Sequence, residues 1–72
     1  MSVQIIPVGF LQPMFPAVDL ETDGKTVDEV LHDLGIHPDL VAIVLINGRQ
    51  APKDAVVRDG DVVKLVPFVG GG

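Results

Sequence analysis

The alternation of apolar and polar positions along the chain predicts a sheet and a single helix. Residues 3–8 are apolar and rich in β-forming side chains, and residues 17–21 alternate with a period of two, so we expect these segments to pair as a hairpin. Residues 9–16 connect them and contain Pro13 and Pro16, which break regular structure. The chain is therefore predicted to open with two strands joined by a long apolar loop.

The most clearly marked element is a helix that begins after Thr26. Thr26 and Glu29 have the spacing of a capping box, in which each side chain accepts a hydrogen bond from an unpaired amide of the first turn. Gly35 has the place of the left-handed residue that ends a helix, and Ile36 is placed to pack back against it. Between these ends, apolar residues recur at the spacing of one helix face: Val27, Val30, Leu31 and Leu34.

The second half of the chain predicts three strands. Residues 40–46 form a continuous aliphatic run, which is typical of a strand covered on both sides or lying at the centre of a sheet. The Asn-Gly pair at residues 47–48 is a strong signal for a hairpin turn, and the return strand is short because Pro52 ends it. A second turn at residues 58–61 leads into the last strand, residues 62–66.

The order of these elements predicts an α+β fold of the β-grasp, or ubiquitin-like, type. One amphipathic helix covers only one face of a small sheet, so we expect a mixed sheet of roughly four to five strands packed on one main helix. A right-handed crossover places the last strand beside the first. We expect residues 1–67 to form this domain and residues 68–72 to form a flexible, glycine-rich tail.

Composition narrows the class of protein. The chain has 72 residues, enough for one domain, and 47% of them are hydrophobic, which is too many for intrinsic disorder. No apolar run reaches the length of a membrane span, and the N-terminus lacks the basic start of a signal peptide. Cysteine is absent, which excludes disulfides and thiolate chemistry. These features predict a cytoplasmic protein.

Charge and side-chain chemistry argue against nucleic-acid binding and against catalysis. The net charge is −5, the five cations are dispersed, and there is no Trp or Tyr to stack on a base. Ser2, Thr22 and Thr26 carry the only hydroxyls, and they do not suggest a nucleophile with a base and an orienting group. We therefore do not expect an enzyme.

Carboxylates and histidines are the other candidates for chemistry. His32 and His37 lie on either side of a helix end, and without cysteine they make a poor metal site, so we expect no metal. Acidic residues in the first turn of a helix or in a tight turn ordinarily act as caps and turn formers. That is where the sequence places carboxylate pairs such as Asp28/Glu29 and Asp59/Asp61.

The three terminal glycines need an explanation, because glycine is costly to order and adds no packing. One explanation is a frayed end or an expression artefact. Another is a segment without side chains that threads a narrow channel in a second protein and delivers the α-carboxylate of Gly72 to a buried reaction centre. That carboxylate, with a reference pKa of about 3.3–3.7, is anionic at neutral pH and can attack an activated phosphate.

The opening hairpin, the capped helix, the segments VLINGR and RDGDVVKLVPFV and the terminal Gly-Gly resemble the ThiS/MoaD group of ubiquitin-like sulfur carriers. The resemblance spans essentially the whole chain and is most specific in the last third. It implies that an adenylating enzyme related to ubiquitin activators uses ATP to convert the C-terminal carboxylate to an acyl-adenylate. A persulfide-bearing sulfur donor of the desulfurase or rhodanese type then forms a thiocarboxylate. By this match Gly72 carries the sulfur, Gly71 is its required partner, and Gly70 extends the threading segment.

The resemblance also implies a carrier and not an enzyme, with no cofactor held stably and ATP used by the partner. The sulfur acceptor is then either thiazole synthase, in thiamine biosynthesis, or the large subunit of molybdopterin synthase, in molybdenum or tungsten cofactor biosynthesis. The three-glycine ending favours the first and the long apolar opening hairpin favours the second. Two other functions stay open: a modifier that joins Gly72 to lysines, and a β-grasp interaction module with an idle tail.

A set of large apolar residues near the first loop and the tail is open to two interpretations, core or docking surface. Phe68 and Val69 are the better docking candidates because they flank the tail that would enter the partner. With Gly70 and Gly71 they are the predicted partner-binding residues. The full set is Phe10, Leu11, Met14, Phe15, Phe68 and Val69.

Overall fold

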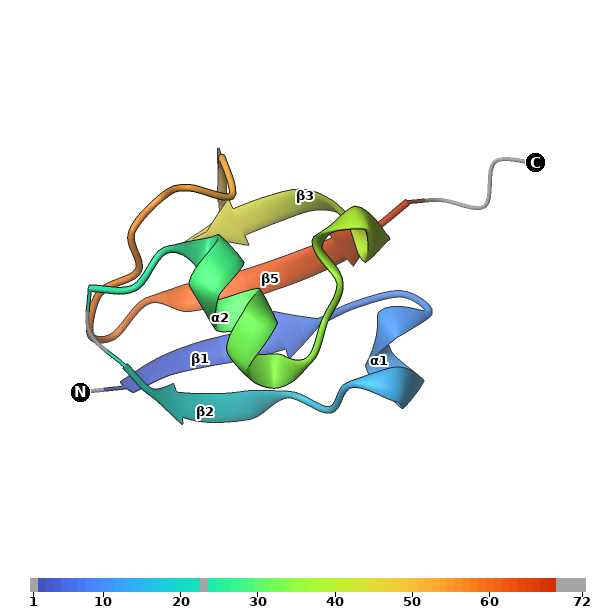
Figure 1. Ribbon diagram of the computed structural model, residues 1–72, viewed down its shortest axis with the longest axis horizontal. Coiled ribbons are helices and arrows are strands. Elements are labelled where there is room, and N and C mark those ends of the chain that lie inside the picture. Colours follow the sequence, from blue (N-terminus) through green and yellow to red (C-terminus); the bar gives the residue numbers. More distant parts are fainter. Residues whose placement is uncertain (1, 23, 69–72) are drawn as a thin grey trace.

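A mixed five-stranded sheet and one main helix form the two layers of the molecule (Figure 1). The computed structural model describes residues 2–22 and 24–68. No helix in these two ranges is long and apolar enough to cross a membrane. In chain order the elements are β1 (Ser2–Pro7), α1 (Leu11–Met14), β2 (Val18–Glu21), α2 (Val27–Leu34), the 3-10 turn η1 (Pro38–Leu40), β3 (Val41–Ile46), β4 (Arg49–Ala51) and β5 (Val62–Pro67).

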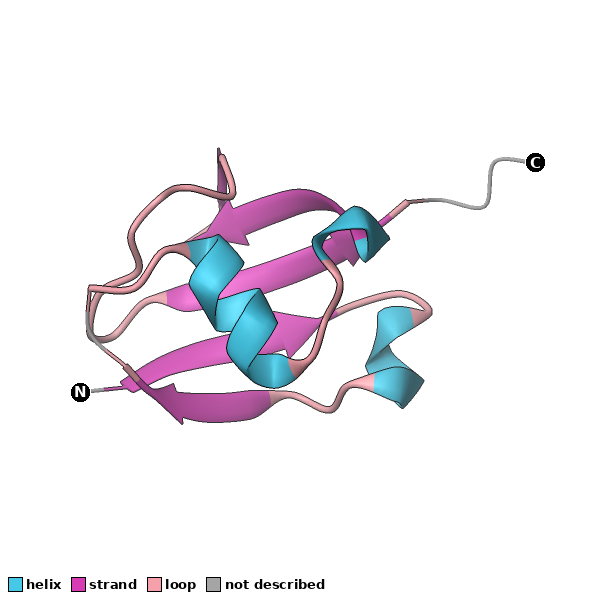
Figure 2. Cartoon of the chain, viewed as in Figure 1, coloured by secondary structure: helices cyan, strands magenta, loops and turns pink. Residues whose placement is uncertain are grey.

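The strand order is that of the predicted β-grasp. The strands lie in the order β2-β1-β5-β3-β4, and α2 crosses one face of this sheet (Figure 2). β5 runs parallel to β1, with Ile5 opposite Val63, and the other pairs are antiparallel. The prediction that the last strand lies beside the first is therefore confirmed.

The position of β3 differs from the expectation. β5, and not the aliphatic β3, is the middle strand, and Ile43 on β3 is 39% exposed, so β3 is not covered on both faces. The pairing of β3 with β5 changes register between Val41 and Ile43. Because this irregularity shifts the alternation, Val41 and Val44 are both buried although they lie an odd number of positions apart. The continuous apolar sequence of β3 therefore results from this change of register as well as from burial.

The core lies between α2 and the inner face of the sheet, where β1 and β5 contribute alternate residues. Residues from α1 and from the segments after α2 and β4 complete it. The buried apolar side chains are Val3, Ile5, Leu11, Val27, Val30, Leu31, Ile36, Val41, Val44, Val57, Val63 and Leu65.

The first connection is not the loop that its prolines suggested. Residues Leu11–Met14 form a short helix, and the Phe15 N–H donates to the Leu11 carbonyl over 2.8 Å. Pro13 is compatible with it because the first turn of a helix leaves its amides without an intrahelical partner. The side chain of Leu11 is fully buried, and it anchors this turn to the core. The connection is thus part of the folded domain.

The helix α2 is confirmed with the bounds and caps that the sequence predicts. The Glu29 N–H donates to Thr26 Oγ1 over 3.2 Å, and the Thr26 N–H donates to Glu29 Oε1 over 2.9 Å. Gly35 is left-handed with φ 74°. The Ile36 N–H then donates to the Leu31 carbonyl over 2.9 Å. Both ends of α2 are therefore fixed by local hydrogen bonds.

A pH-dependent loss of stability is expected at the first turn of α2. The hydrogen bond from the Thr26 N–H lowers the pKa of Glu29 below its ordinary value of 4.5. A lowered pKa means that the ionised carboxylate stabilises the fold at pH values above 4.5. This effect is lost as the pH falls through the folded-state pKa. Glu29→Gln should therefore lower the free energy of unfolding near neutral pH and have little effect in strong acid, as measured by urea unfolding.

The control for this measurement is Asp54→Asn, which neutralises an exposed carboxylate in a turn. It should leave the free energy of unfolding nearly unchanged at both pH values. An equal effect of Glu29→Gln in neutral and acidic solution would contradict the assignment, because the amide stabilises the ionised carboxylate more than a neutral side chain.

Candidate functional site

The candidate site is the end of β5, where the chain leaves the sheet. Along β5 the side chains of Val63, Leu65 and Pro67 point into the core, and Lys64 between them is exposed. Phe68 follows directly and is 59% exposed. The other predicted site residues, Val69, Gly70, Gly71 and Gly72, lie outside the described part of the chain. The structure thus places the start of the tail, at Phe68, on the surface at one end of the sheet.

The end of β5 shares its end of the molecule with α1 (Figure 1). Here the structure divides the apolar set whose role the sequence left open. Leu11 is fully buried and Phe15 packs against the core. Phe10 and Met14 are 51% and 56% exposed, slightly less than the 59% of Phe68. These three are the described members of the set that remain exposed, and they are the ones that a docking surface at this end of the molecule could use.

The start of β5 is fixed by a link between two turns that the sequence predicts separately. Asn47 Nδ2 donates to Asp61 Oδ1 over 2.9 Å, and Asn47 Oδ1 accepts from the Val62 N–H over 2.9 Å. Asp61 Oδ2 accepts from the Arg58 N–H over 2.9 Å. These bonds join the β3–β4 turn to the first residue of β5. They help to set the register in which β5 runs toward the tail.

The carboxylates that were weighed for acid–base chemistry have structural partners. Glu29 closes the capping box of α2, and Asp61 joins the two turns. Asp59 Oδ1 accepts from the Ser2 N–H over 2.7 Å. Asp28 is exposed in the first turn of α2, where a negative charge suits the helix dipole. Their contacts are those of caps and turns, as the sequence predicts.

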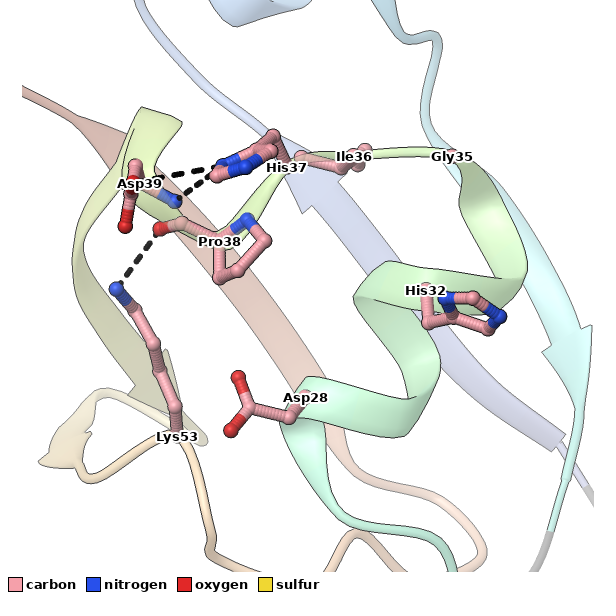
Figure 3. Close-up of a pocket in the computed structure, with 8 residues that line it drawn as sticks. All are labelled: Asp28, His32, Gly35, Ile36, His37, Pro38, Asp39 and Lys53. Atoms are coloured by element: carbon pink, nitrogen blue, oxygen red, sulfur yellow. Dashed lines mark hydrogen bonds and ion pairs between the residues drawn. The ribbon is translucent and has the colours of Figure 1, made fainter.

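The two histidines line a hollow of about 660 Å³ between α2, η1 and Lys53 (Figure 3). Two hydrogen bonds join groups that line it: Lys53 Nζ donates to the Pro38 carbonyl over 2.8 Å, and His37 Nδ1 accepts from the Asp39 N–H over 3.1 Å. Residues 2–22 and 24–68 contain no group of three or more side chains that could hold a metal ion. The side chains that line the hollow therefore do not form a metal site.

Comparison with known proteins finds a family model and several proteins that are similar to this chain over most of its length. A model of the ThiS family matches residues 9–72. The sulfur carrier protein ThiS of Thermus thermophilus is 41% identical over 54 residues, which cover 69% of this chain and 83% of that protein. SAMP1 of Haloferax volcanii has a TM-score of 0.77 at 25% identity, over the whole of both chains. A complex of subunits 1 and 2 of the molybdopterin-converting factor from Helicobacter pylori contains a chain that matches with a TM-score of 0.69 at 22% identity, again over both whole chains.

These matches agree with the β-grasp architecture, and the family match also includes the terminal glycines. The family model covers the chain from Gly9, before α1, through β5 and the three glycines to Gly72. The solved structures share the β-grasp arrangement of sheet and helix. The chain therefore belongs to the ThiS family, within the ThiS/MoaD group of ubiquitin-like sulfur carriers.

Proposed function

We propose that the chain carries sulfur as a thiocarboxylate on Gly72 for the biosynthesis of a cofactor. The observation that supports this most directly is the match of the ThiS family model through the last residue, Gly72. The structure adds that Phe68, the residue after β5, is exposed. In the sequence, Val69 and three glycines follow it. A glycine segment suits delivery of a main-chain carboxylate into a partner's channel, because no Cβ obstructs it.

In the proposed reaction, the Gly72 carboxylate attacks the α-phosphorus of ATP in a ubiquitin-activator-like enzyme, and pyrophosphate leaves. The terminal sulfur of a persulfide donor, of the desulfurase or rhodanese type, then attacks the acyl carbon and displaces AMP. A second thiol takes the donor sulfur into a disulfide and frees the thiocarboxylate. The chain itself is a substrate in each step and not the catalyst. It holds no cofactor stably, and ATP is consumed by the partner.

We propose that the sulfur acceptor is a synthase. This chain would dock on it through the surface next to its own C-terminal tail. The Helicobacter pylori relative in fold was solved as a complex of subunits 1 and 2 of its molybdopterin-converting factor. The Thermus thermophilus relative is a ThiS carrier. We accordingly propose either thiazole synthase or the large subunit of molybdopterin synthase as the acceptor.

Mass spectrometry of the intact chain tests this proposal. The protein is incubated with ATP, the ubiquitin-activator-like enzyme of its own organism and a persulfide donor. We expect a mass gain equal to the difference between sulfur and oxygen, dependent on ATP and lost on hydrolysis. Adducts to lysines of other proteins without this mass gain would instead support the protein modifier. An unchanged chain would favour a simple interaction module.

Phe68→Ala is expected to weaken docking on the adenylating enzyme without weakening the fold. Phe68 is 59% exposed, so its truncation should change the free energy of unfolding by less than about 0.5 kcal/mol. An aromatic residue at the centre of an interface ordinarily contributes more than 1 kcal/mol, so the KM for the carrier in adenylation should rise about tenfold.

Val56→Ala is the matched control, since Val56 is also apolar and 43% exposed but precedes β5 and lies beside Thr26. Its KM should equal that of the unmodified chain. Equal KM values for both variants would remove Phe68 from the docking surface.

A further inference from the structure

The turn between β1 and α1 lies against the end of β5. The Val8 N–H donates to the Leu65 carbonyl over 3.0 Å, which continues the parallel pairing of β1 and β5. One residue later, Gly9 lies against the buried ring of Pro67. The chain then turns into α1, where the Gln12 N–H donates to the Gly9 carbonyl over 3.1 Å. The last residue of β5 is thus enclosed by a segment that belongs to the opening of the chain.

Gly9 is distinctive among the glycines of residues 2–22 and 24–68. Its φ is +60°, and a Cβ built on it would lie 3.0 Å from Pro67 Cγ and 3.4 Å from Pro67 Cδ. At the other described glycines, all of which also have positive φ, an added Cβ would meet nothing within 4 Å. Gly9 therefore serves a close approach as well as a turn.

We propose that Gly9 is a positioning residue for the C-terminal segment. Its missing side chain allows the ring of Pro67 to close against the β1–α1 turn, and this contact fixes where β5 ends and in which direction the chain continues at Phe68. The inference rests on the proposed function, because it assigns Gly9 a role in presenting Gly72 to the adenylating enzyme.

A small displacement caused by contact with Gly9 is transmitted to the backbone through the ring of Pro67. Proline closes its side chain onto its own backbone nitrogen, so a displaced ring moves the backbone with it. A Cβ at Gly9 would need the ring to give by a few tenths of an ångström. The peptide that leads to Phe68 then shifts relative to the docked domain. Reaction rates are sensitive to such displacements, since a misplacement of about 1 Å can cost about 100-fold.

The experiment compares Gly9→Ala with Gly60→Ala in ATP–pyrophosphate exchange by the ubiquitin-activator-like enzyme. Gly60 has φ +86° and open space around it, and its N–H donates to the Ser2 carbonyl at the other end of β1. Both variants place a side chain at positive φ and share that backbone strain, and Gly9→Ala adds the contact with Pro67. Only Gly9→Ala should lower kcat, by about fivefold, with the KM for the carrier unchanged. Equal kcat values would overturn the proposal.

A double-mutant cycle with Pro67→Ala tests the contact itself. Pro67→Ala removes the two ring atoms that the new Cβ would meet, so adding Gly9→Ala to it should have less effect on kcat than adding it to the unmodified chain. Additive effects of the two changes would show that Gly9 acts by another route, and the inference would be wrong.

A measurement without the enzyme separates this inference from the proposed function. In amide NMR spectra, Gly9→Ala should shift the resonances of Leu65, Val66 and Phe68, whereas Gly60→Ala should leave them in place. If the unmodified chain supports no pyrophosphate exchange, the proposed function fails even though these shifts occur. If exchange occurs but the shifts do not, the positioning role of Gly9 fails alone.

Discussion

Removal of Gly71 and Gly72 is expected to abolish adenylation and thiocarboxylate formation and to leave the fold intact. The proposed reacting group is the carboxylate of the last residue, and the truncated chain would present it from Gly70. Two residues fewer shorten the reach of an extended chain by about 7 Å, which places the carboxylate far from the α-phosphorus of ATP. The core of the described residues is formed between Val3 and Leu65, so the free energy of unfolding should change by less than about 0.5 kcal/mol.

ATP–pyrophosphate exchange and intact-protein mass spectrometry check this result, and urea unfolding provides the test of folding. Gly71→Ala is the companion variant, because it keeps the length of the tail and adds only a Cβ. Loss of exchange in both variants would indicate a narrow channel, whereas loss in the truncation alone would indicate reach. Sulfur transfer by the truncated chain would refute the proposed role of the tail.

The largest loss of stability is expected from Leu65→Ala, with a decrease of about 3 kcal/mol in the free energy of unfolding. Leu65 is 1% exposed and lies on β5, the middle strand of the sheet. Truncation removes buried methyl groups and leaves a cavity that the rigid sheet can only partly fill. Small domains are ordinarily stable by about 5–15 kcal/mol, so this single change takes a large share of the total.

Lys64→Ala is the matched control on the neighbouring residue of the same strand. Lys64 is exposed on the outer face, so its truncation should change the free energy of unfolding by less than about 0.5 kcal/mol. Equilibrium unfolding in urea measures both variants. Similar losses for Leu65→Ala and Lys64→Ala would contradict the assignment of the inner and outer faces of β5.

Much of the fold was predictable because its signals are local. The capping box of Thr26 and Glu29 and the glycine after α2 depend on residues within one or two turns, and both occur as expected. The parallel pairing of β1 with β5 followed from general rules of handedness and burial, since the last strand is among the most apolar. The resemblance carried by the last third of the chain is confirmed at the level of the family.

Other features depend on contacts between distant segments. The helix α1 forms although it contains a proline, because Leu11 packs into the core. The sequence of the connection alone does not reveal this packing. Asn47 and Asp61 lie 14 positions apart in the chain, and their turns are joined only once β3 and β5 pair. Composition likewise could not say which large apolar side chains stay exposed.

The sequence by itself determined the strands, the helix α2, the β-grasp order and the glycine end that directs attention to Gly72, because each is encoded by neighbouring residues or by simple rules of connection. The tertiary structure alone decided that Phe10, Met14 and Phe68 remain exposed, and that Gly9 lies against Pro67. Exposure and close approach are properties of surfaces made by segments far apart in the chain. They exist only after the sheet has brought the opening turn and the last strand together.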